Sequence, residues 1–230
     1  MRIIFVRHGE PDYDNDCLTA NGIIQARKTA ARLKDEDIKA VYSSPMGRAV
    51  QTAFHTAADH GLEVNILDFM HEIDWGGRDG RTLEYDGHPW TLGHMLIAED
   101  PALLEDDRWR EHHYFKDNIC LAHYDRISDL TDRFLEGYGL IREGDIYKAS
   151  LLTDDTIAIF AHGGSGAVIL SHILNIPFPY VLAAMPYGVC SVSILDLHPL
   201  TGDKVIPRIE LFNDMGHLGD VRKETLRFEK

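Results

Sequence analysis

Four short segments of the chain carry residue types that bind and transfer phosphoryl groups. They contain Arg7 and His8, then Arg48, then Glu72, and finally His162 and Gly163. Arginine carries a permanent charge and pairs with oxyanions through two parallel hydrogen bonds. Backbone N–H groups where a glycine-rich turn enters a helix also bind anions. A tetrahedral phosphate held by Arg7, Arg48, His162 and Gly163 is therefore the expected occupant.

The chemistry expected of this set is nucleophilic catalysis at phosphorus. His8 is the candidate nucleophile, because a neutral imidazole can attack phosphorus in line and form phosphohistidine. Glu72 is the candidate acid, which protonates the leaving alcohol and then deprotonates the attacking water. Asp74 and Asp79 could share that role. The arginines and His162 would neutralise charge on the equatorial oxygens, so the hypothesis needs no metal and no cofactor.

Short apolar runs precede these residues and predict the strands that position them. Strands are expected at 3–6, 39–42, 62–67 and 156–161, and two more at 191–197 and 204–211 could form a hairpin around 199–202. Helices are expected from Thr19, from Pro45 to near Gly61, and, after a glycine-rich turn at 162–166, over 167–174. The first helix should bury a face made of Ile23, Ala26, Ala30 and Leu33.

Alternating strands and helices indicate an α/β fold, with three α/β/α layers and a mostly parallel central sheet. Ligands of such sheets bind outside the carboxyl ends of the strands, where the candidate residues would converge. We expect one domain over 1–230 with a helical insertion at about 84–153 that covers these strand ends. Its helices are expected near 90–98, 103–112 and 123–138. The insertion could be a lid or merely a solvated face.

Composition narrows the class of protein. The formal net charge is −14. Residues 81–150 hold 15 acidic and 8 basic residues, so their net charge of −7 is half of that total. Nucleic-acid binders and proteins that dock on anionic membranes need the opposite sign. Three distant cysteines form no disulfide framework, and the short N-terminal apolar run is no signal peptide. Of the 13 histidines, the ten other than His8, His71 and His162 show no metal-binding spacing. These features favour a soluble cytoplasmic protein.

The chain resembles the histidine phosphatase superfamily, in its phosphoglycerate mutase-like branch. The resemblance rests on the segments 5–10, 18–26, 42–53, 72–76 and 161–163, in the family's order, and covers 1–83 and 154–197 but not 84–153. It implies that His8 is phosphorylated, that Arg7, Arg48 and His162 surround the phosphate, and that Glu72 is the acid. The chain departs from the family after Gly76, where Arg78 could add a cation or lie on the surface.

Hydrolysis of a small phosphorylated metabolite is the favoured function. The alternatives are phosphoryl transfer of the phosphoglycerate mutase type and a phosphate-binding module without turnover. The Arg-His-Tyr type of run that follows the glutamate in mutases is replaced by Ile73-Asp74-Trp75, which favours the hydrolase. A serine esterase is disfavoured, because Ser165 lacks the surrounding GxSxG elbow. The natural substrate and the oligomeric state stay open.

Overall fold

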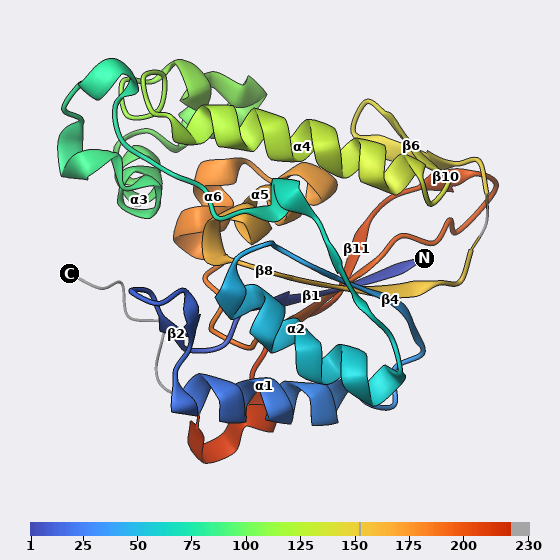
Figure 1. Cartoon of the computed structure of the whole chain (residues 1–230). Helices are drawn as coiled ribbons and strands as arrows, with labels where there is room; N and C mark the ends of the chain where they lie inside the picture. Colours follow the sequence, from blue (N-terminus) through green and yellow to red (C-terminus); the bar gives the residue numbers. More distant parts are fainter. Residues whose placement is uncertain (152, 222–230) are drawn as a thin grey trace. The chain divides into compact units, whose positions relative to one another are not determined.

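The computed structural model describes residues 1–151 and 153–221 (Figure 1). Residue 152, which falls in the expected insertion, and residues 222–230 lie outside the described residues. The chain divides into two compact units. The first is made of Met1–His71, Asp132–Gly163 and Tyr187–Lys230, and the second of Glu72–Thr131 and Gly164–Pro186.

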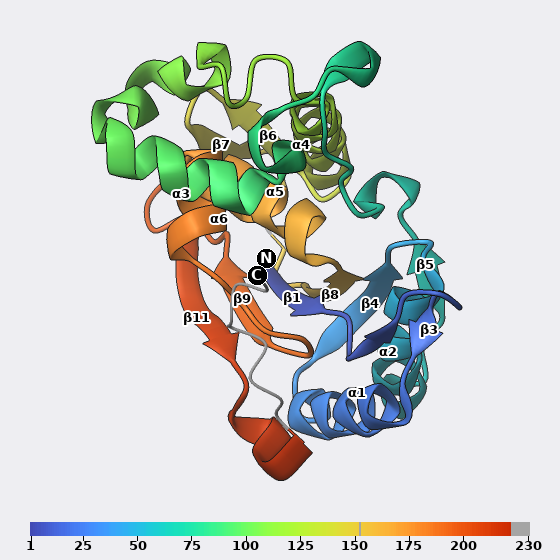
Figure 2. The same ribbon diagram turned by 90° about the vertical axis from the view of Figure 1, so that its left-hand side faces the viewer.

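The first unit is built on a six-stranded sheet with the order β11-β9-β1-β8-β4-β5 (Figure 2). Its strands are β1 (Arg2–Arg7), β4 (Ile38–Ser43), β5 (Val64–Ile66), β8 (Thr156–Ala161), β9 (Val192–Asp196) and β11 (Arg208–Asp214). The four strands β1, β8, β4 and β5 pair in parallel, whereas β9 and β11 are antiparallel to their neighbours. This mixed, mostly parallel sheet confirms the predicted α/β class.

Two helices of the first unit, α1 (Ala20–Leu33) and α2 (Gly47–His60), pack against each other, and α2 packs on the sheet. As predicted, the Thr19 side chain caps α1 by accepting from the N–H of Gly22, and Gly61 ends α2 in the left-handed conformation. The predicted apolar face of α1 is right except for Ile23, which is 37% exposed. Gln25 and Thr29 are buried on that helix instead, because polar partners on neighbouring segments satisfy them.

The central strands are buried on both faces, as their continuous apolar runs predict. All six residues of β8 are buried, and so are Ile3 to Val6 of β1. One face packs Val6, Val41 and Phe160 into a core with Leu33 of α1 and Ala57 of α2. A strand that is inaccessible on both faces is rigid, so the residues at its end have fixed positions.

Short antiparallel strands appear where the sequence predicts none. β2 (Pro11–Asp12) pairs with β3 (Cys17–Leu18), and β6 (Leu140–Glu143) forms a hairpin with β7 (Ile146–Ala149). The helical insertion expected at about 84–153 thus contains a β-hairpin in addition to helices. β10 (Lys204–Val205) pairs with β7 and belongs to this second sheet, so the expected strand 204–211 is really two strands. The β7–β10 pairing joins distant segments, which local periodicity cannot reveal, whereas β2–β3 and β6–β7 are pairings of neighbouring segments.

The second unit is mainly helical. It contains α3 (Pro89–Glu99), α6 (Phe178–Ala184) and the 3₁₀ segments η2 (Arg78–Gly80), η3 (Glu84–Gly87) and η4 (Pro101–Glu111). Two further helices, α4 (Cys120–Glu136) and α5 (Gly163–Leu174), contain residues of both units. The 3₁₀ segments η1 (Asp68–Met70) and η5 (Gly216–Val221) belong to the first unit. The expected helix at 103–112 is wrong as an α-helix. Asp106 and Asp107 adopt positive φ values of 52° and 56°, and the Asp107 carboxylate accepts from the indole of buried Trp109 at 3.0 Å.

Two predicted helix starts are also shifted. α2 begins at Gly47 instead of Pro45. α5 begins at Gly163, so the expected glycine-rich turn at 162–166 is the first turn of that helix. The predictions at 90–98 and 123–138 are confirmed as α3 and α4 within three residues at each end. The position of the insertion over the strand ends stays a prediction.

Candidate active site

His8 directly follows β1, and its backbone N–H continues the ladder to the carbonyl of Ala161 at 2.9 Å. The side chain is only 1% exposed. Its Nδ1 lies 2.8 Å from the carbonyl oxygen of Gly9. A carbonyl oxygen only accepts hydrogen bonds, so Nδ1 must carry the proton. The Nε2 atom of the neutral ring therefore holds the lone pair that a nucleophile needs.

The surroundings of His8 keep its imidazole neutral. Burial, with the nearby charges of Arg7 and Arg48, lowers the pKa of His8 to about 3, although the carbonyl of Gly9 opposes the shift. Bringing a positive charge into a buried site beside two guanidinium groups is unfavourable. The histidine is consequently in its nucleophilic form at neutral pH without help from a base.

His162 is the partner that β8 places next to His8. It follows the last residue of β8 and is fully buried, and the two imidazole ring centroids are 5.1 Å apart. Its Nε2 shares a hydrogen bond of 2.7 Å with the hydroxyl of Ser44, which follows β4. Burial and the neighbouring His8 and Arg48 lower the pKa of His162 to about 2. The His162 imidazole is thus neutral and can contribute hydrogen bonds but no charge. The positive charge at the site comes from Arg7 and Arg48.

The two arginines are held through terminal nitrogens of the guanidinium group, and Nη2 of Arg48 donates to Met46 Sδ at 3.2 Å. Arg7 Nη1 donates to the carbonyl of Tyr187 at 2.9 Å, and Arg48 Nη1 donates to the Asp16 carboxylate at 2.6 Å. Among the described residues, no partner accepts from the buried Nε–H of either arginine. Buried donors are almost always satisfied, so two such groups beside His8 indicate a site for an anion.

Gly163 lies next to Arg7 at the start of α5. A Cβ at this position would be 3.5 Å from the Arg7 Cζ atom, which is ordinary contact. The Tyr187 hydroxyl donates to the carbonyl of Gly163 at 2.6 Å and is also 3.1 Å from that of His162. Tyr187 therefore ties the end of β8 and the start of α5 together, and its own carbonyl holds Arg7.

Glu72 belongs to the second unit, where the backbone of α5 holds its carboxylate. Its Oε1 accepts from the N–H groups of Ile73, Gly164 and Ser165 at 3.0, 2.9 and 2.9 Å. All three bonds go to one oxygen. The second oxygen, Oε2, is bonded to no described residue and is available to a ligand.

The absence of a side chain at Gly164 is what permits this arrangement. A Cβ there would be 2.7 Å from Glu72 Oε1 and 2.7 Å from Ile73 Cδ1, too close for real atoms. Of the other two carboxylates considered for the acid, Asp74 is exposed and pairs with His123 at 3.6 Å, and Asp79 is exposed in a turn. Arg78 is also exposed, which favours the surface alternative for it.

The structure therefore brings Arg7, His8, Arg48, His162 and Gly163 together within the first unit. Three contributors were not predicted as site residues. Ser44 stands in the segment 42–53 that carries the family resemblance, and Asp16 in a stretch rich in turn-forming residues, so a weak signal existed for both. Tyr187 follows no strand, and its contact with Arg7 spans 180 residues, so nothing local points to it.

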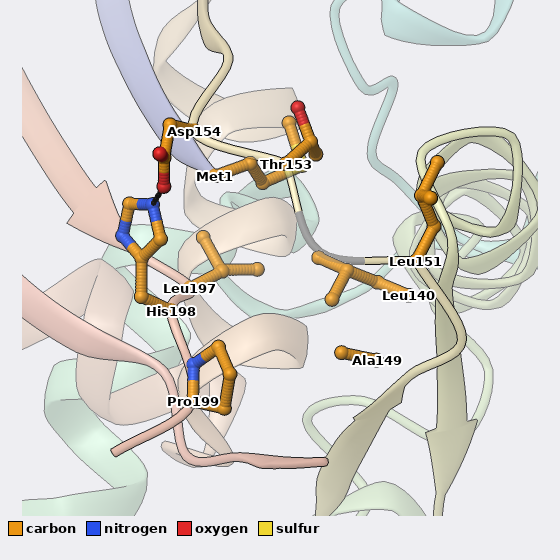
Figure 3. Close-up of a pocket in the computed structure, with 9 residues that line it drawn as sticks. All are labelled: Met1, Leu140, Ala149, Leu151, Thr153, Asp154, Leu197, His198 and Pro199. Carbon is orange, nitrogen blue, oxygen red and sulfur yellow. Dashed lines mark ion pairs between the residues drawn. The ribbon is translucent and has the colours of Figure 1, made fainter. Parts of the chain in front are cut away.

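A cavity elsewhere in the first unit is separate from this site (Figure 3). Its volume is about 200 Å³, and its lining includes Met1, Thr153 and Asp154, which precede β1 and β8, and His198. It thus lies at the amino ends of the strands whose carboxyl ends carry the candidate residues. Asp154 pairs with His198 at 3.3 Å but is fully exposed, so water screens the pair.

Across residues 1–151 and 153–221, no three His, Cys, Asp or Glu side chains are grouped so that they could hold a metal ion. Over the same residues no helix is both long and apolar enough to cross a membrane.

Comparison with known proteins assigns the chain to a family. The model of the histidine phosphatase superfamily, branch 1, matches residues 3–116. The chain belongs to the histidine phosphatase superfamily, in agreement with its phosphoglycerate mutase-like motifs.

Some curated relatives are named phosphoglycerate mutases and others phosphatases. The chain is 36% identical over 118 residues to a 2,3-bisphosphoglycerate-dependent phosphoglycerate mutase of Thermoplasma acidophilum, covering 46% of this chain and 58% of that protein. It is 29% identical over 114 residues to phosphoserine phosphatase 1 of Hydrogenobacter thermophilus, covering 46% of this chain and 54% of that one. The chain thus spans about half the length of these curated relatives.

Solved structures share the fold over nearly the whole chain. A phosphoserine phosphatase from Entamoeba histolytica, in complex with 3-phosphoglyceric acid, matches with a TM-score of 0.63 at 23% identity, covering 94% of this chain and 98% of that one. A mycobacterial glucosyl-3-phosphoglycerate phosphatase matches with a TM-score of 0.59 at 20% identity, covering 92% and 98%. At these identities the likeness concerns the fold.

Proposed function

We propose that the protein is a metal-independent phosphomonoester hydrolase that acts on a small phosphorylated metabolite through a phosphohistidine at His8. The observation that carries the proposal is the protonated Nδ1 of His8, which donates to Gly9 and leaves Nε2 free beside two unpartnered guanidinium N–H groups. The two arginines supply the positive charge that a metal ion would otherwise bring to the phosphate.

The first step transfers the phosphoryl group to the protein. His8 Nε2 attacks phosphorus, the ester P–O bond breaks, and the protonated carboxyl of Glu72 gives its proton to the leaving oxygen. The hydrogen bond from Nδ1 to the Gly9 carbonyl stabilises the positive charge that develops on the ring. The Nε–H groups of Arg7 and Arg48, with His162 and the N–H of Gly163, bind the oxygens of the transferred group.

The second step releases phosphate. The Glu72 carboxylate takes a proton from water, the water oxygen attacks phosphorus, and the P–N bond breaks. Inorganic phosphate leaves, His8 is neutral again, and Glu72 carries the proton needed for the next cycle. The proton count closes over the two steps, so no further acid, base or cofactor is required.

The substrate class follows from charge. An acidic chain whose candidate site concentrates Arg7 and Arg48 suits a compact phosphate monoester and repels an extended polyanion such as nucleic acid. We also assign the protein to the cytoplasm, on its unpaired cysteines.

The test is a phosphoenzyme assay. The wild-type protein should hydrolyse p-nitrophenyl phosphate after exhaustive chelation, and protein quenched during turnover should carry a phosphate that is stable to base and labile to acid. His8→Ala should lose both, whereas His94→Ala, which removes an exposed histidine, should keep both. Labelled phosphate on His8→Ala, or complete loss of activity on chelation, would refute the proposal.

Mutase chemistry is the second candidate, because the relative that shares 36% identity is named a phosphoglycerate mutase. It uses the same first step and returns the phosphoryl group to a bound phosphoglycerate. Incubating 3-phosphoglycerate with 2,3-bisphosphoglycerate and protein separates the two, since a mutase yields 2-phosphoglycerate and a hydrolase yields inorganic phosphate. Phosphate binding with neither product would indicate a binding module.

A further inference from the structure

The turn between β2 and β3 reaches the start of α2 and contacts Arg48. In that turn, the two carboxylate oxygens of Asp16 have different partners. Oδ2 accepts from the backbone N–H of Gly47 at 2.7 Å, and Oδ1 accepts from Arg48 Nη1 at 2.6 Å. Met46, the residue before α2, makes no capping bond of its own. Asp16 thus caps the helix from a distant segment and binds the arginine in its first turn.

The backbone is shaped for this contact. Asp16 has a φ of 45°, in the left-handed region that Asp and Asn tolerate better than other residues with a side chain. Gly47 is required opposite it, because a Cβ at Gly47 would collide with the backbone oxygen of Asp16. Asp12 stabilises the turn by accepting from the N–H groups of Asp14 and Asn15 at 3.1 and 3.3 Å.

The pair is asymmetric in exposure. The Arg48 side chain is 6% exposed, whereas that of Asp16 is 44% exposed. Burial raises the pKa of Asp16, but hydrogen bonds from the Gly47 N–H and the Arg48 guanidinium lower it by more. The pKa is therefore below its ordinary value, and the carboxylate is ionised at neutral pH. The contact occupies Nη1 of the guanidinium, Nη2 donates to Met46 Sδ at 3.2 Å, and the buried Nε–H has no described partner.

We propose that Asp16 is a positioning residue that fixes one edge of the Arg48 guanidinium and so presents the Nε–H to the phosphate. The proposal rests on the proposed function, since it assumes that Arg48 binds phosphate. An arginine side chain has several rotatable bonds, and holding it in the binding geometry beforehand removes an ordering cost from each binding event. Because α2 itself anchors the carboxylate through Gly47, Asp16 and Arg48 keep one fixed relation.

The test measures binding of inorganic phosphate by calorimetry to the wild type, Asp16→Asn and Asp14→Asn. Asparagine keeps an oxygen for the Gly47 N–H and tolerates positive φ, but it lacks the charge that holds Arg48. Asp14 is an exposed carboxylate of the same turn and is the matched control. Loss of a negative charge alone strengthens binding of an anion in both variants. If Asp16 positions Arg48, phosphate binding should instead become weaker in Asp16→Asn, and in that variant only.

We expect Asp16→Asn to raise the Kd of phosphate about tenfold, the size of one lost charge-assisted hydrogen bond. Asp14→Asn should bind as tightly as the wild type or more tightly. In turnover, Asp16→Asn should raise KM with a smaller change in kcat, because the positioned group binds phosphate in both the ground state and the transition state. In an Arg48→Ala background, Asp16→Asn should no longer weaken binding and should behave like Asp14→Asn.

The outcomes separate the two proposals. If the wild type binds phosphate and Asp16→Asn matches Asp14→Asn, the positioning role is wrong. The same holds if Asp16→Asn weakens binding equally with and without Arg48. If Asp16→Asn fails to fold, Asp16→Ser, which keeps a short acceptor for the helix start, replaces it with the same expected loss. A wild type that forms no phosphohistidine overturns the proposed function, whatever the Asp16 variants do.

Discussion

Two neutral imidazoles buried beside two arginines make stability depend on pH in a direction that can be calculated. In the folded protein His8 stays neutral down to a pKa of about 3, whereas its ordinary value is 6.5. Between these values the unfolded chain binds a proton that the folded protein does not bind. Acidification through this window therefore favours unfolding, and stability rises again as the pH increases towards 6.5.

The size of the effect follows from the same values. Each pH unit below 6.5 changes the free energy of unfolding by about 1.4 kcal/mol for a group that is protonated only when unfolded. At pH 5 the His8 imidazole thus destabilises the fold by about 2 kcal/mol relative to pH 8. That is a large part of the stability of an ordinary domain. His162, with a pKa of about 2, acts in the same direction.

The assay is urea unfolding of the wild type, His8→Asn and His94→Asn at pH 8 and pH 5. Tryptophan fluorescence and far-ultraviolet circular dichroism should both be followed, because the chain has two compact units. Acidification also reduces repulsion in a chain of net charge −14, so only the difference between variants is interpreted. His8→Asn should lose about 2 kcal/mol less than the wild type between the two pH values.

The control decides the interpretation. His94 is exposed, and its replacement removes no buried imidazole, so His94→Asn should follow the wild type. If His8→Asn shows the same pH dependence as His94→Asn, His8 does not stay neutral in the folded protein, and the account of its nucleophilic form fails with it.

Two further predictions concern the carboxylate of the second unit. Gly164→Ala should destabilise the protein by about 1–3 kcal/mol in urea unfolding, because the new methyl group would press on Glu72 and Ile73. Gly163→Ala has room, so a similar loss of stability in that variant would show that the cause is not this contact. Glu72→Gln should slow aryl phosphates with poor leaving groups by roughly 10²–10⁴-fold and those with good leaving groups much less. Equal slowing across a leaving-group series would exclude Glu72 as the acid.

Local patterns in the sequence were sufficient for much of the fold. The continuous apolar runs of β1 and β8 predicted buried parallel strands, because only strands covered on both faces are apolar throughout. Thr19 and Gly61 marked helix ends through their own hydrogen bonding and backbone freedom. Where a local pattern met an irregular backbone the prediction failed, as at Asp106 and Asp107, whose positive φ values break the expected helix.

The sequence by itself determined that Arg7, His8, Arg48 and His162 stand at or just past the ends of strands or at the start of a helix, and a parallel sheet brings such ends to one edge. Only the tertiary structure decided how these residues are held and charged. The carbonyl of Tyr187, the carboxylate of Asp16 and the hydroxyl of Ser44 come from distant segments, and no periodicity indicates which of them will meet. The neutral state of both histidines depends on burial and on the distances to two guanidinium charges, and these exist only after the chain has folded.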